Sequence, residues 1–271
     1  MAFNFKIGWR KAKAFAIKDF KNQFRFKVSL LNHLLDPVLA VTAFFVTYTA
    51  VFFGGNIEDL GYVQKSNYVI YLLTGFLAYS AFRMAWKRTT LSGEKYMLTL
   101  EGILLSPGGR WYYLFGRALI ALIDVVIILV LFGSTIWLLH PQVNIPNLIY
   151  GSISLVLLYV IFISLDFIVS GIEIAEEGIA GFIRTYAPKA FLLIGCVYFP
   201  IDILPSFLRP IVYINPLYHA VNLFRSAFMQ ADLSFGMNNS LIYLIVLACI
   251  LPPLAIRVFS WIFKKWGIRG Y

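Results

Sequence analysis

Six apolar stretches recur along the chain, and each approaches or exceeds the ~20 residues that an α-helix needs to cross a bilayer. Hydrophobic residues make up 60% of the sequence and charged residues only 13%, a composition typical of membrane proteins. Cys196 and Cys249 both fall in apolar stretches and the histidines lack ligand spacing, so no disulfide or metal site is expected. We predict an all-α polytopic membrane protein with six transmembrane helices, at about Leu30–Phe53, Tyr68–Arg88, Trp111–Leu139, Leu148–Gly171, Gly181–Val197 and Leu241–Phe263.

Residues 1–27 predict an amphipathic helix that lies in the membrane interface. Its apolar face carries residues spaced three or four apart, namely Phe5, Trp9, Ala12, Ala16 and Phe20. Lysines and arginines take most of the other positions, and a basic helix of this kind binds anionic lipid. A nucleic-acid-binding arm would leave the apolar face without a partner. We therefore expect membrane lipids and no nucleic acid as partners, and the helix either only anchors the chain or also gates a substrate.

The distribution of cations predicts the orientation of the six-span domain, residues 28–271. Lysines and arginines gather in the N-terminal helix, in the segment Lys87–Arg110 and at the C-terminus. Six spans put these segments on one side, and the positive-inside rule makes that side, with both termini, cytoplasmic. Glu173, Glu176 and Glu177 are acidic on this same side, but acidic residues weigh little in the rule. We expect a multi-pass protein of the cell membrane without a cleaved signal peptide.

The segment from about residue 198 to residue 230 is apolar and aromatic, yet it is broken by Pro200, Pro205 and Pro216. Each proline removes an amide donor and pushes the preceding residue out of the helical region. Broken backbone at membrane depth is tolerated only where it is buried in protein or lines a cavity. We predict a re-entrant helical hairpin before the last span, and the alternative is a hydrophobic surface loop. The two short helices are expected at roughly Ile203–Tyr213 and Leu217–Met229.

This segment also resembles the late region of ABC-2 type exporter permeases. Those proteins are the membrane subunits of ABC transporters that export lipid-linked saccharides, polysaccharides or hydrophobic drugs. The resemblance rests on an ordered set of residues: Tyr198-Phe199-Pro200, Leu204-Pro205, Asn215-Pro216-Leu217 and Arg225.

The segment Glu94–Arg117 carries a second resemblance to this family. It is similar to the family's short amphipathic coupling helix between the second and third spans, which ends before a proline, here Pro107. In the family this helix sits in a groove of the ATPase subunit and transmits its motion, and an apolar face flanked by charges suits such docking. The resemblance places the helix at about residues 94–106, and the alternative is a helix on the lipid surface. The candidate coupling residues are Glu94, Thr99, Leu100, Glu101, Ile103, Leu104 and Leu105.

No motif for ATP hydrolysis or other enzymatic chemistry is evident in the sequence. Ser92-Gly93-Glu94-Lys95 lacks the leading glycine and the spacing of a phosphate-binding loop, and the aspartates are scattered rather than clustered around a catalytic metal. The resemblance implies a homodimer with two copies of a separate ABC ATPase, which would bind ATP and Mg²⁺, so no cofactor is expected on this chain. A membrane-embedded lipid-modifying enzyme and an ATP-independent channel are the competing functions.

Asp124 is an ionisable residue inside the third predicted span. It lies roughly 20 Å along the helix from Arg110, near the bilayer midplane, where a carboxylate must be protonated, paired or hydrated. Arg117, two helical turns earlier on nearly the same face, is one candidate partner, and a residue on another span is the other. Asp124 is thus a candidate either for structural pairing or for a place along the transport pathway.

A stripe of aromatic residues follows one face of the second predicted span: Tyr68, Tyr71, Tyr79, Phe82 and Trp86, with Gly75 between them. Interfacial belts cluster at the two ends of a span, whereas this stripe runs through it. The rings either pack against a neighbouring span or line a pathway on which sugar rings stack and slide. On the second interpretation we hypothesise that the cargo is a lipid-linked oligosaccharide or polysaccharide rather than a hydrophobic drug or lipid.

Overall fold

The computed structural model describes residues 5–25, 27–54, 59–60, 63–86, 88–106, 109–139, 143–229 and 235–266. Within these residues the chain is almost entirely helical, as the apolar periodicity predicts, and contains one two-stranded hairpin. The elements in chain order are α1 (Phe5–Arg25), α2 (Lys27–Thr49), the π-helical turn η1 (Ala50–Gly54), β1 (Asp59–Leu60), β2 (Val63–Gln64), α3 (Tyr68–Ala85), α4 (Ser92–Tyr96), α5 (Leu100–Leu105), α6 (Gly109–Leu139), α7 (Ile145–Ala175), α8 (Glu177–Ile194), the 3-10 turn η2 (Ile201–Ile203), α9 (Arg209–Ile214), α10 (Pro216–Arg225) and α11 (Met237–Trp266).

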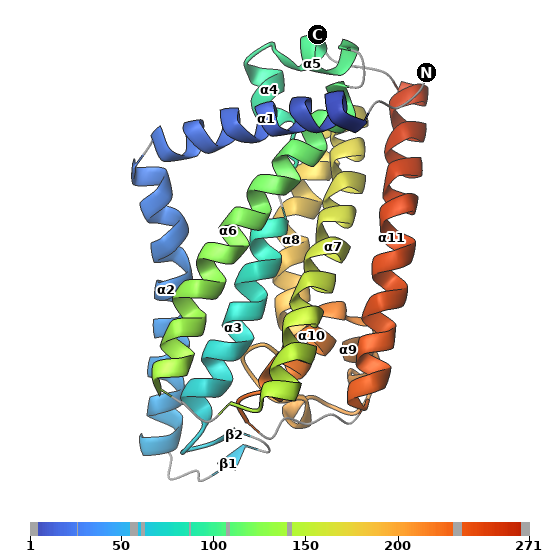
Figure 1. Cartoon of the computed structure of the whole chain (residues 1–271). Helices are drawn as coiled ribbons and strands as arrows, with labels where there is room; N and C mark the ends of the chain where they lie inside the picture. The colour runs from blue at the N-terminus through green and yellow to red at the C-terminus, as the bar shows by residue number, and fades with distance from the viewer. Residues whose placement is uncertain are drawn as a thin grey trace.

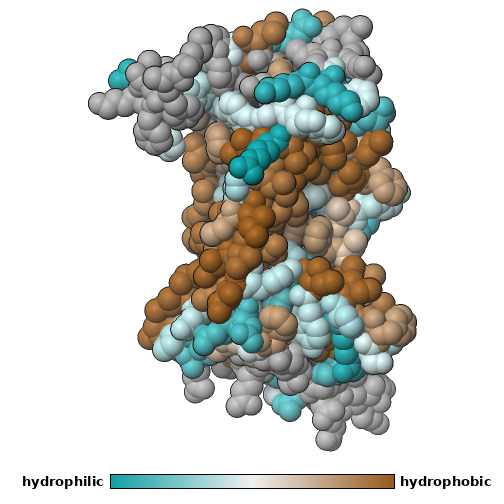
Figure 2. All heavy atoms as spheres, turned by 90° about the vertical axis from the view of Figure 1, so that its right-hand side faces the viewer, coloured by the Kyte–Doolittle hydropathy of each residue, from teal (hydrophilic) through white to brown (hydrophobic). Residues whose placement is uncertain are grey.

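The long helices run side by side, and short elements lie at both ends of the bundle (Figure 1). α1 lies across one end, next to α4 and α5, and we call this the α1 end. The β1–β2 hairpin lies at the opposite end, which we call the hairpin end, and α9 and α10 occupy the same half of the molecule. Figure 2 shows a broad hydrophobic band around the middle of one face, with hydrophilic residues above and below it. A membrane-spanning bundle presents this distribution to the bilayer.

Four of the described helices are long and apolar enough to cross a membrane: α3, α6, α7 and α11. The sequence predicts a span at each of them, and the chain is a multi-pass helical membrane protein. α8 is less apolar because Glu177, Arg184 and Lys189 interrupt its 18 residues. The described part of α2 and η1 contributes a shorter apolar helix, Val41–Phe53.

Aromatic rings from three helices meet in the centre of the bundle. Phe82 of α3 lies 4.1 Å from Phe162 of α7, measured between ring centroids, and Phe162 lies 4.9 Å from Phe191 of α8. Contacts of this kind add to the free energy gained by burying the rings. The packing of α3 against α7 and α8 therefore fixes where the chain leaves α3 at the α1 end.

The proline-containing segment forms two short helices, α9 and α10. The expected first helix, Ile203–Tyr213, is too long, because Leu204 adopts an extended backbone before Pro205 (φ −75°, ψ 140°) and α9 begins only at Arg209. Asn215 is extended in the same way before Pro216, and its side chain accepts a hydrogen bond from the Leu217 amide at 3.0 Å. α10 then ends at Arg225 rather than Met229, and all ten of its residues are buried.

Candidate coupling site

The chain between α3 and α6 exposes several large apolar side chains at the α1 end. We call residues 92–106, which contain α4 and α5, the coupling segment. The exposed fractions are 79% for Tyr96, 76% for Met97, 71% for Leu98 and 75% for Leu105. Large exposed apolar patches are rare on soluble monomeric proteins, and where they occur they usually mark an interaction site.

A single coupling helix over residues 94–106 is predicted from the sequence, but the structure contains two helices separated by a turn. Leu98 has a φ of +56°, in the left-handed region that non-glycine residues rarely adopt. The Thr99 amide donates back to the Glu94 carbonyl at 3.0 Å, which closes the turn. A reversal at Leu98 therefore replaces the continuous helix and holds Met97 and Leu98 outward.

The predicted coupling residues divide between the inner and outer sides of this segment. Glu94 is buried and forms an ion pair with Lys18 of α1 at 3.1 Å. Burial alone would raise the pKa of Glu94, but hydrogen bonds from Thr99 and Lys18 outweigh it and the pKa is lowered. Leu100 is also buried, Ile103 is half-buried, and Thr99, Glu101 and Leu105 are exposed. The side chain of Leu104 lies outside the described residues.

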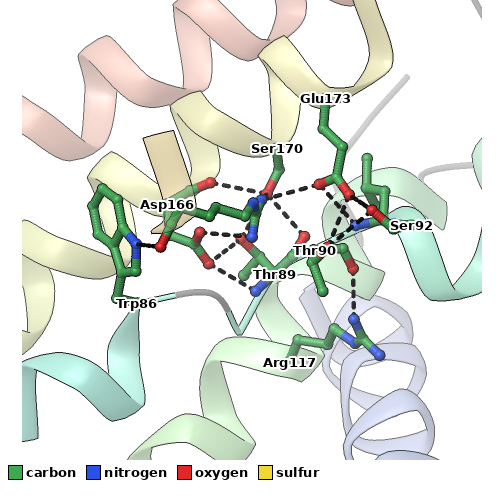
Figure 3. Close-up of polar contacts among 10 residues, drawn as sticks. Trp86, Thr89, Thr90, Ser92, Arg117, Asp166, Ser170 and Glu173 are labelled. Atoms are coloured by element: carbon green, nitrogen blue, oxygen red, sulfur yellow. Dashed lines mark hydrogen bonds and ion pairs between the residues drawn. The ribbon is translucent and has the colours of Figure 1, made fainter. Parts of the chain in front are cut away.

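Glu173 of α7 caps the first helix of the coupling segment. Its carboxylate accepts hydrogen bonds from the amide of Leu91 at 3.0 Å and from the amide of Ser92 at 2.7 Å (Figure 3). The hydroxyls of Thr90 and Ser92 donate to the same carboxylate. Leu91 occupies the N-cap position of α4 and has no capping oxygen of its own, so a carboxylate from another helix satisfies the amides at this helix start.

Arg184 of α8 joins two buried carboxylates of α7 at the same place. Its guanidinium lies 3.0 Å from a carboxylate oxygen of Asp166 and 3.0 Å from one of Glu173 (Figure 3). Asp166 also accepts hydrogen bonds from the amide and the hydroxyl of Thr89, each at 2.7 Å. Ser170 accepts from Arg184 at 2.8 Å and donates to the Thr89 carbonyl at 2.8 Å. We call Asp166, Ser170, Glu173 and Arg184 the anchor network.

Two further helices hold the coupling segment. Arg117 of α6 donates to the Thr90 carbonyl at 2.6 Å and forms an ion pair with Asp19 of α1 at 2.7 Å. Lys95 pairs with Glu177 at the start of α8 at 3.0 Å. The coupling segment and the residues just before it, Thr89–Leu91, are thus attached to α1, α6, α7 and α8.

Arg117 is not the partner of Asp124. A carboxylate oxygen of Asp124 lies 3.3 Å from the guanidinium of Arg88, on the connection that follows α3. Arg117 lies where α1 crosses α6, and its guanidinium is taken by Asp19. Asp124 is therefore paired with a residue on another segment, the second of the two partners that the sequence leaves open.

Arg225 fixes the proline-containing segment to α3. It is buried, and its guanidinium donates to the carbonyls of Cys196 at 3.0 Å and Val197 at 2.6 Å. It also lies 3.5 Å from the ring centroid of Tyr71, whose hydroxyl donates to the Cys196 carbonyl at 3.1 Å. The side-chain amide of Asn215 also donates a hydrogen bond to the Phe191 carbonyl at 3.0 Å. Among the other residues of this resemblance, Pro200 is buried, Phe199 and Leu204 are half-buried, and Pro205 is exposed.

All five rings of the aromatic stripe are buried within the chain: Tyr68, Tyr71, Tyr79, Phe82 and Trp86. Phe82 and Trp86 contact Phe162 and Phe191, and the Trp86 indole donates to the Arg184 carbonyl at 3.3 Å. In this conformation the stripe packs inside one copy of the chain, as one of its two interpretations describes. Its place on a transport pathway stays a prediction.

The sequence reasoning missed Arg184, and did not connect Asp166 and Glu173 with the coupling segment. One signal was present, because an arginine within a span-length apolar stretch is itself a reason to expect a buried acidic partner. The sequence does not show which residues of α7 and α8 lie opposite each other, because the hydrophobic periodicity of one helix does not determine its alignment with another.

An exposed apolar segment, tied by ion pairs and hydrogen bonds to a bundle of long apolar helices, gives this membrane protein a candidate docking surface at its α1 end. The chain belongs to the ABC-2 type transporter family, whose profile matches residues 11–229. It is 21% identical over 213 residues to the inner membrane transport permease YadH of Escherichia coli K12, which covers 77% of this chain and 80% of that protein. The YadH permease of Shigella flexneri matches to the same extent. The family is that of ABC transporter membrane subunits, and membership implies an ABC ATPase as partner.

Proposed function

We propose that this chain is the permease subunit of an ABC exporter in the inner membrane of the cell, with ATP hydrolysis performed by a separate subunit. The coupling segment carries this proposal, because it combines an exposed apolar surface with a rigid attachment to four helices. An apolar surface on the aqueous side of a membrane protein suits docking into a groove of a soluble subunit. The coupling segment would move with the ATPase, and the anchor network would carry that motion to α7 and α8.

The proposal includes six spans, with α2 and α8 crossing the membrane beside the four longer helices. α1 would lie on the cytoplasmic surface, and both termini would be cytoplasmic. The cations Lys18, Lys95 and Arg117 near the α1 end support this orientation. The segment with α9 and α10 would be re-entrant, and the complete burial of α10 supports this, since broken backbone at membrane depth needs such burial.

A homodimer with two ATPase subunits is proposed from the exposed face of α8. Thr185, Tyr186 and Lys189 are exposed on this helix. A lysine facing lipid within the membrane costs about 2.5–3.5 kcal/mol at the centre of a span. This face suits a second copy of the chain, or a hydrated pathway between two copies, better than it suits lipid.

The proposed cargo is a lipid-linked oligosaccharide or polysaccharide, and the alternative is a hydrophobic drug or lipid. Tyr186 supports the saccharide, since an exposed ring can stack on sugars. Lys189 lies 5.2 Å from that ring and would attract a phosphate between sugar and lipid. The test is mass spectrometry of ligands retained by the purified permease–ATPase complex. Retained glycolipids would support the saccharide, and retention of unglycosylated hydrophobic compounds alone would overturn it.

The variant Leu105→Asp tests the coupling role. We expect it to insert and fold, because the side chain is exposed, but to reduce ATPase binding and export at least tenfold. The reason is that docking would bury an unpaired carboxylate in an apolar contact. Leu105→Met is the matched control and should retain both activities. Export at the unmodified rate by Leu105→Asp would show that this helix is not the docking element.

A further inference from the structure

A cavity of about 480 Å³ lies among the long helices near the α1 end. Trp9 and Ala12 of α1 roof it, and α6 lines it between Trp111 and Leu122. α7 contributes residues from Tyr159 to Phe167, and α11 contributes Pro252 and Ile256. The volume falls within the roughly 300–1,000 Å³ of small-molecule sites.

The tilt of α6 creates this groove. Trp111 of α6 and Phe259 of α11 are in contact, with ring centroids 5.4 Å apart. From there α6 runs away from α11 toward the hairpin end, with α7 between them (Figure 1). The roof lies directly on α6 at Gly116, where an added Cβ would come within 2.7 Å of the Ala12 carbonyl oxygen. Any larger residue at position 116 would push α1 away from α6.

The chemistry of the lining fits a hydrocarbon chain. Its polar side chains include Tyr159 and Ser164, and both hydroxyls are used inside the chain: Tyr159 donates to the Ala118 carbonyl and Ser164 to the Val160 carbonyl. Trp111 and Tyr112 of α6 bring an indole and a phenol to the α1 end of the groove, and the other side chains from α6, α7 and α11 are aliphatic or aromatic carbon. A polar ligand would lose its hydration without gaining partners from these groups.

The length of the groove matches one leaflet of a bilayer. From Trp111 to Leu122 the helix rises about 16 Å, and from Tyr159 to Phe167 it rises about 12 Å. Half of the ~30 Å hydrocarbon core is about 15 Å. A groove of this length on a membrane-spanning bundle suits a single acyl chain that enters from the leaflet on the α1 side.

The mouth of the groove is basic and aromatic. Arg10 and Lys13 are exposed on α1, and each follows directly after a lining residue, Trp9 or Ala12. Lys11 lies 5.5 Å from the ring centroid of Tyr112. Cations and tryptophan at the end of an apolar groove are complementary to an anionic headgroup with its acyl chain below.

We infer that this groove binds an anionic glycerophospholipid of the α1-side leaflet, with one acyl chain against α6 and α7 and its phosphate near Arg10 and Lys13. The inference is independent of the transported compound. α1 also pairs with the coupling segment through Lys18 and Glu94, so lipid binding would stabilise the helix that braces this segment.

The experiment uses the purified permease–ATPase complex in phosphatidylcholine nanodiscs with a trace of a lipid that carries a photoreactive diazirine on one acyl chain. The probes are phosphatidylglycerol, phosphatidylcholine and a polyprenyl phosphate, and mass spectrometry locates the cross-links. We expect phosphatidylglycerol to label peptides containing Trp111–Leu122 and Tyr159–Phe167. Ala118→Trp, which fills the groove, should reduce this labelling at least fivefold.

Val130→Trp is the matched control, because Val130 is exposed on the same helix but in the half of the membrane nearer the hairpin end. In this variant phosphatidylglycerol should label the groove as strongly as in the unmodified protein. Replacing Arg10 and Lys13 together by alanine should remove the preference for phosphatidylglycerol over phosphatidylcholine. If Ala118→Trp unfolds the protein, Leu119→Trp takes its place. The assignment would be overturned if neither Ala118→Trp nor Leu119→Trp reduced the labelling of the groove. Labelling by the polyprenyl phosphate alone would also overturn it.

Discussion

Gly75→Ala should lower the free energy of unfolding by about 3 kcal/mol or more, because the added methyl group enters space that Arg225 occupies. A Cβ on Gly75 would also lie 2.6 Å from the Val197 carbonyl oxygen, which is the closest acceptor of that guanidinium. Moving either the Val197 backbone or the buried Arg225 side chain would cost free energy, because both are packed in the interior. The displaced guanidinium would lose charge-assisted hydrogen bonds to the carbonyls of Cys196 and Val197 at a buried position.

Thermal or denaturant unfolding of the purified chain in detergent measures this effect. Gly133→Ala is the control, because Gly133 also lies in a long helix and a Cβ there would meet no atom within 4 Å. It should leave stability unchanged or raise it slightly. Arg225→Met should be destabilised to a similar degree as Gly75→Ala, since it removes the arginine donor from both carbonyls and leaves Cys196 with only the Tyr71 hydroxyl. Equal stability of the Gly75 and Gly133 variants would show that Arg225 is not fixed against α3.

Arg184→Leu should destabilise the protein by about 3–5 kcal/mol, because it leaves Asp166 and Glu173 buried without a cation. Arg257→Leu removes an exposed arginine from α11 and should change stability little. Arg184→Lys keeps the charge but cannot reach both carboxylates with a planar fork, so we expect an intermediate loss.

Arg184→Leu also distinguishes a role in coupling from a role in stability. Glu173 also caps α4, so the coupling segment should lose its fixed position when the anchor network is disturbed. In a complex stabilised at low temperature, we expect Arg184→Leu to retain ATP hydrolysis while export falls. Export and hydrolysis that fall in parallel would mean that the network only stabilises the fold.

The long apolar helices could be predicted from the sequence because each carries its own signal. α6 was expected at Trp111–Leu139 and runs from Gly109 to Leu139, and α3 begins at Tyr68 as expected. α8 begins at Glu177, four residues before the predicted start, because its charged residues hide its first turn from a pattern based on hydrophobicity. The fold class thus followed from composition and period, while exact boundaries depended on tertiary partners.

The candidate site could be predicted only in part. The sequence predicts a coupling helix at about residues 94–106, which stays a prediction, and the reversal at Leu98 and the inward position of Glu94 depend on bonds to Thr99 and Lys18. The anchor network joins residues that are 11 to 18 positions apart on different helices, and their meeting follows from how α7 and α8 pack. The hydrophobic pattern within each helix does not determine how the two helices pack.

Photo-cross-linking at Met97 tests the account most directly. Met97 is 76% exposed in the turn of the coupling segment, and Phe207 is 74% exposed beside α9 at the other end of the bundle. Each is replaced in turn by p-benzoyl-phenylalanine in the permease expressed with its ATPase. The account predicts a cross-link to the ATPase subunit from position 97 and none from position 207. A complex that co-purifies without a cross-link at position 97, or that cross-links at position 207 instead, would contradict it.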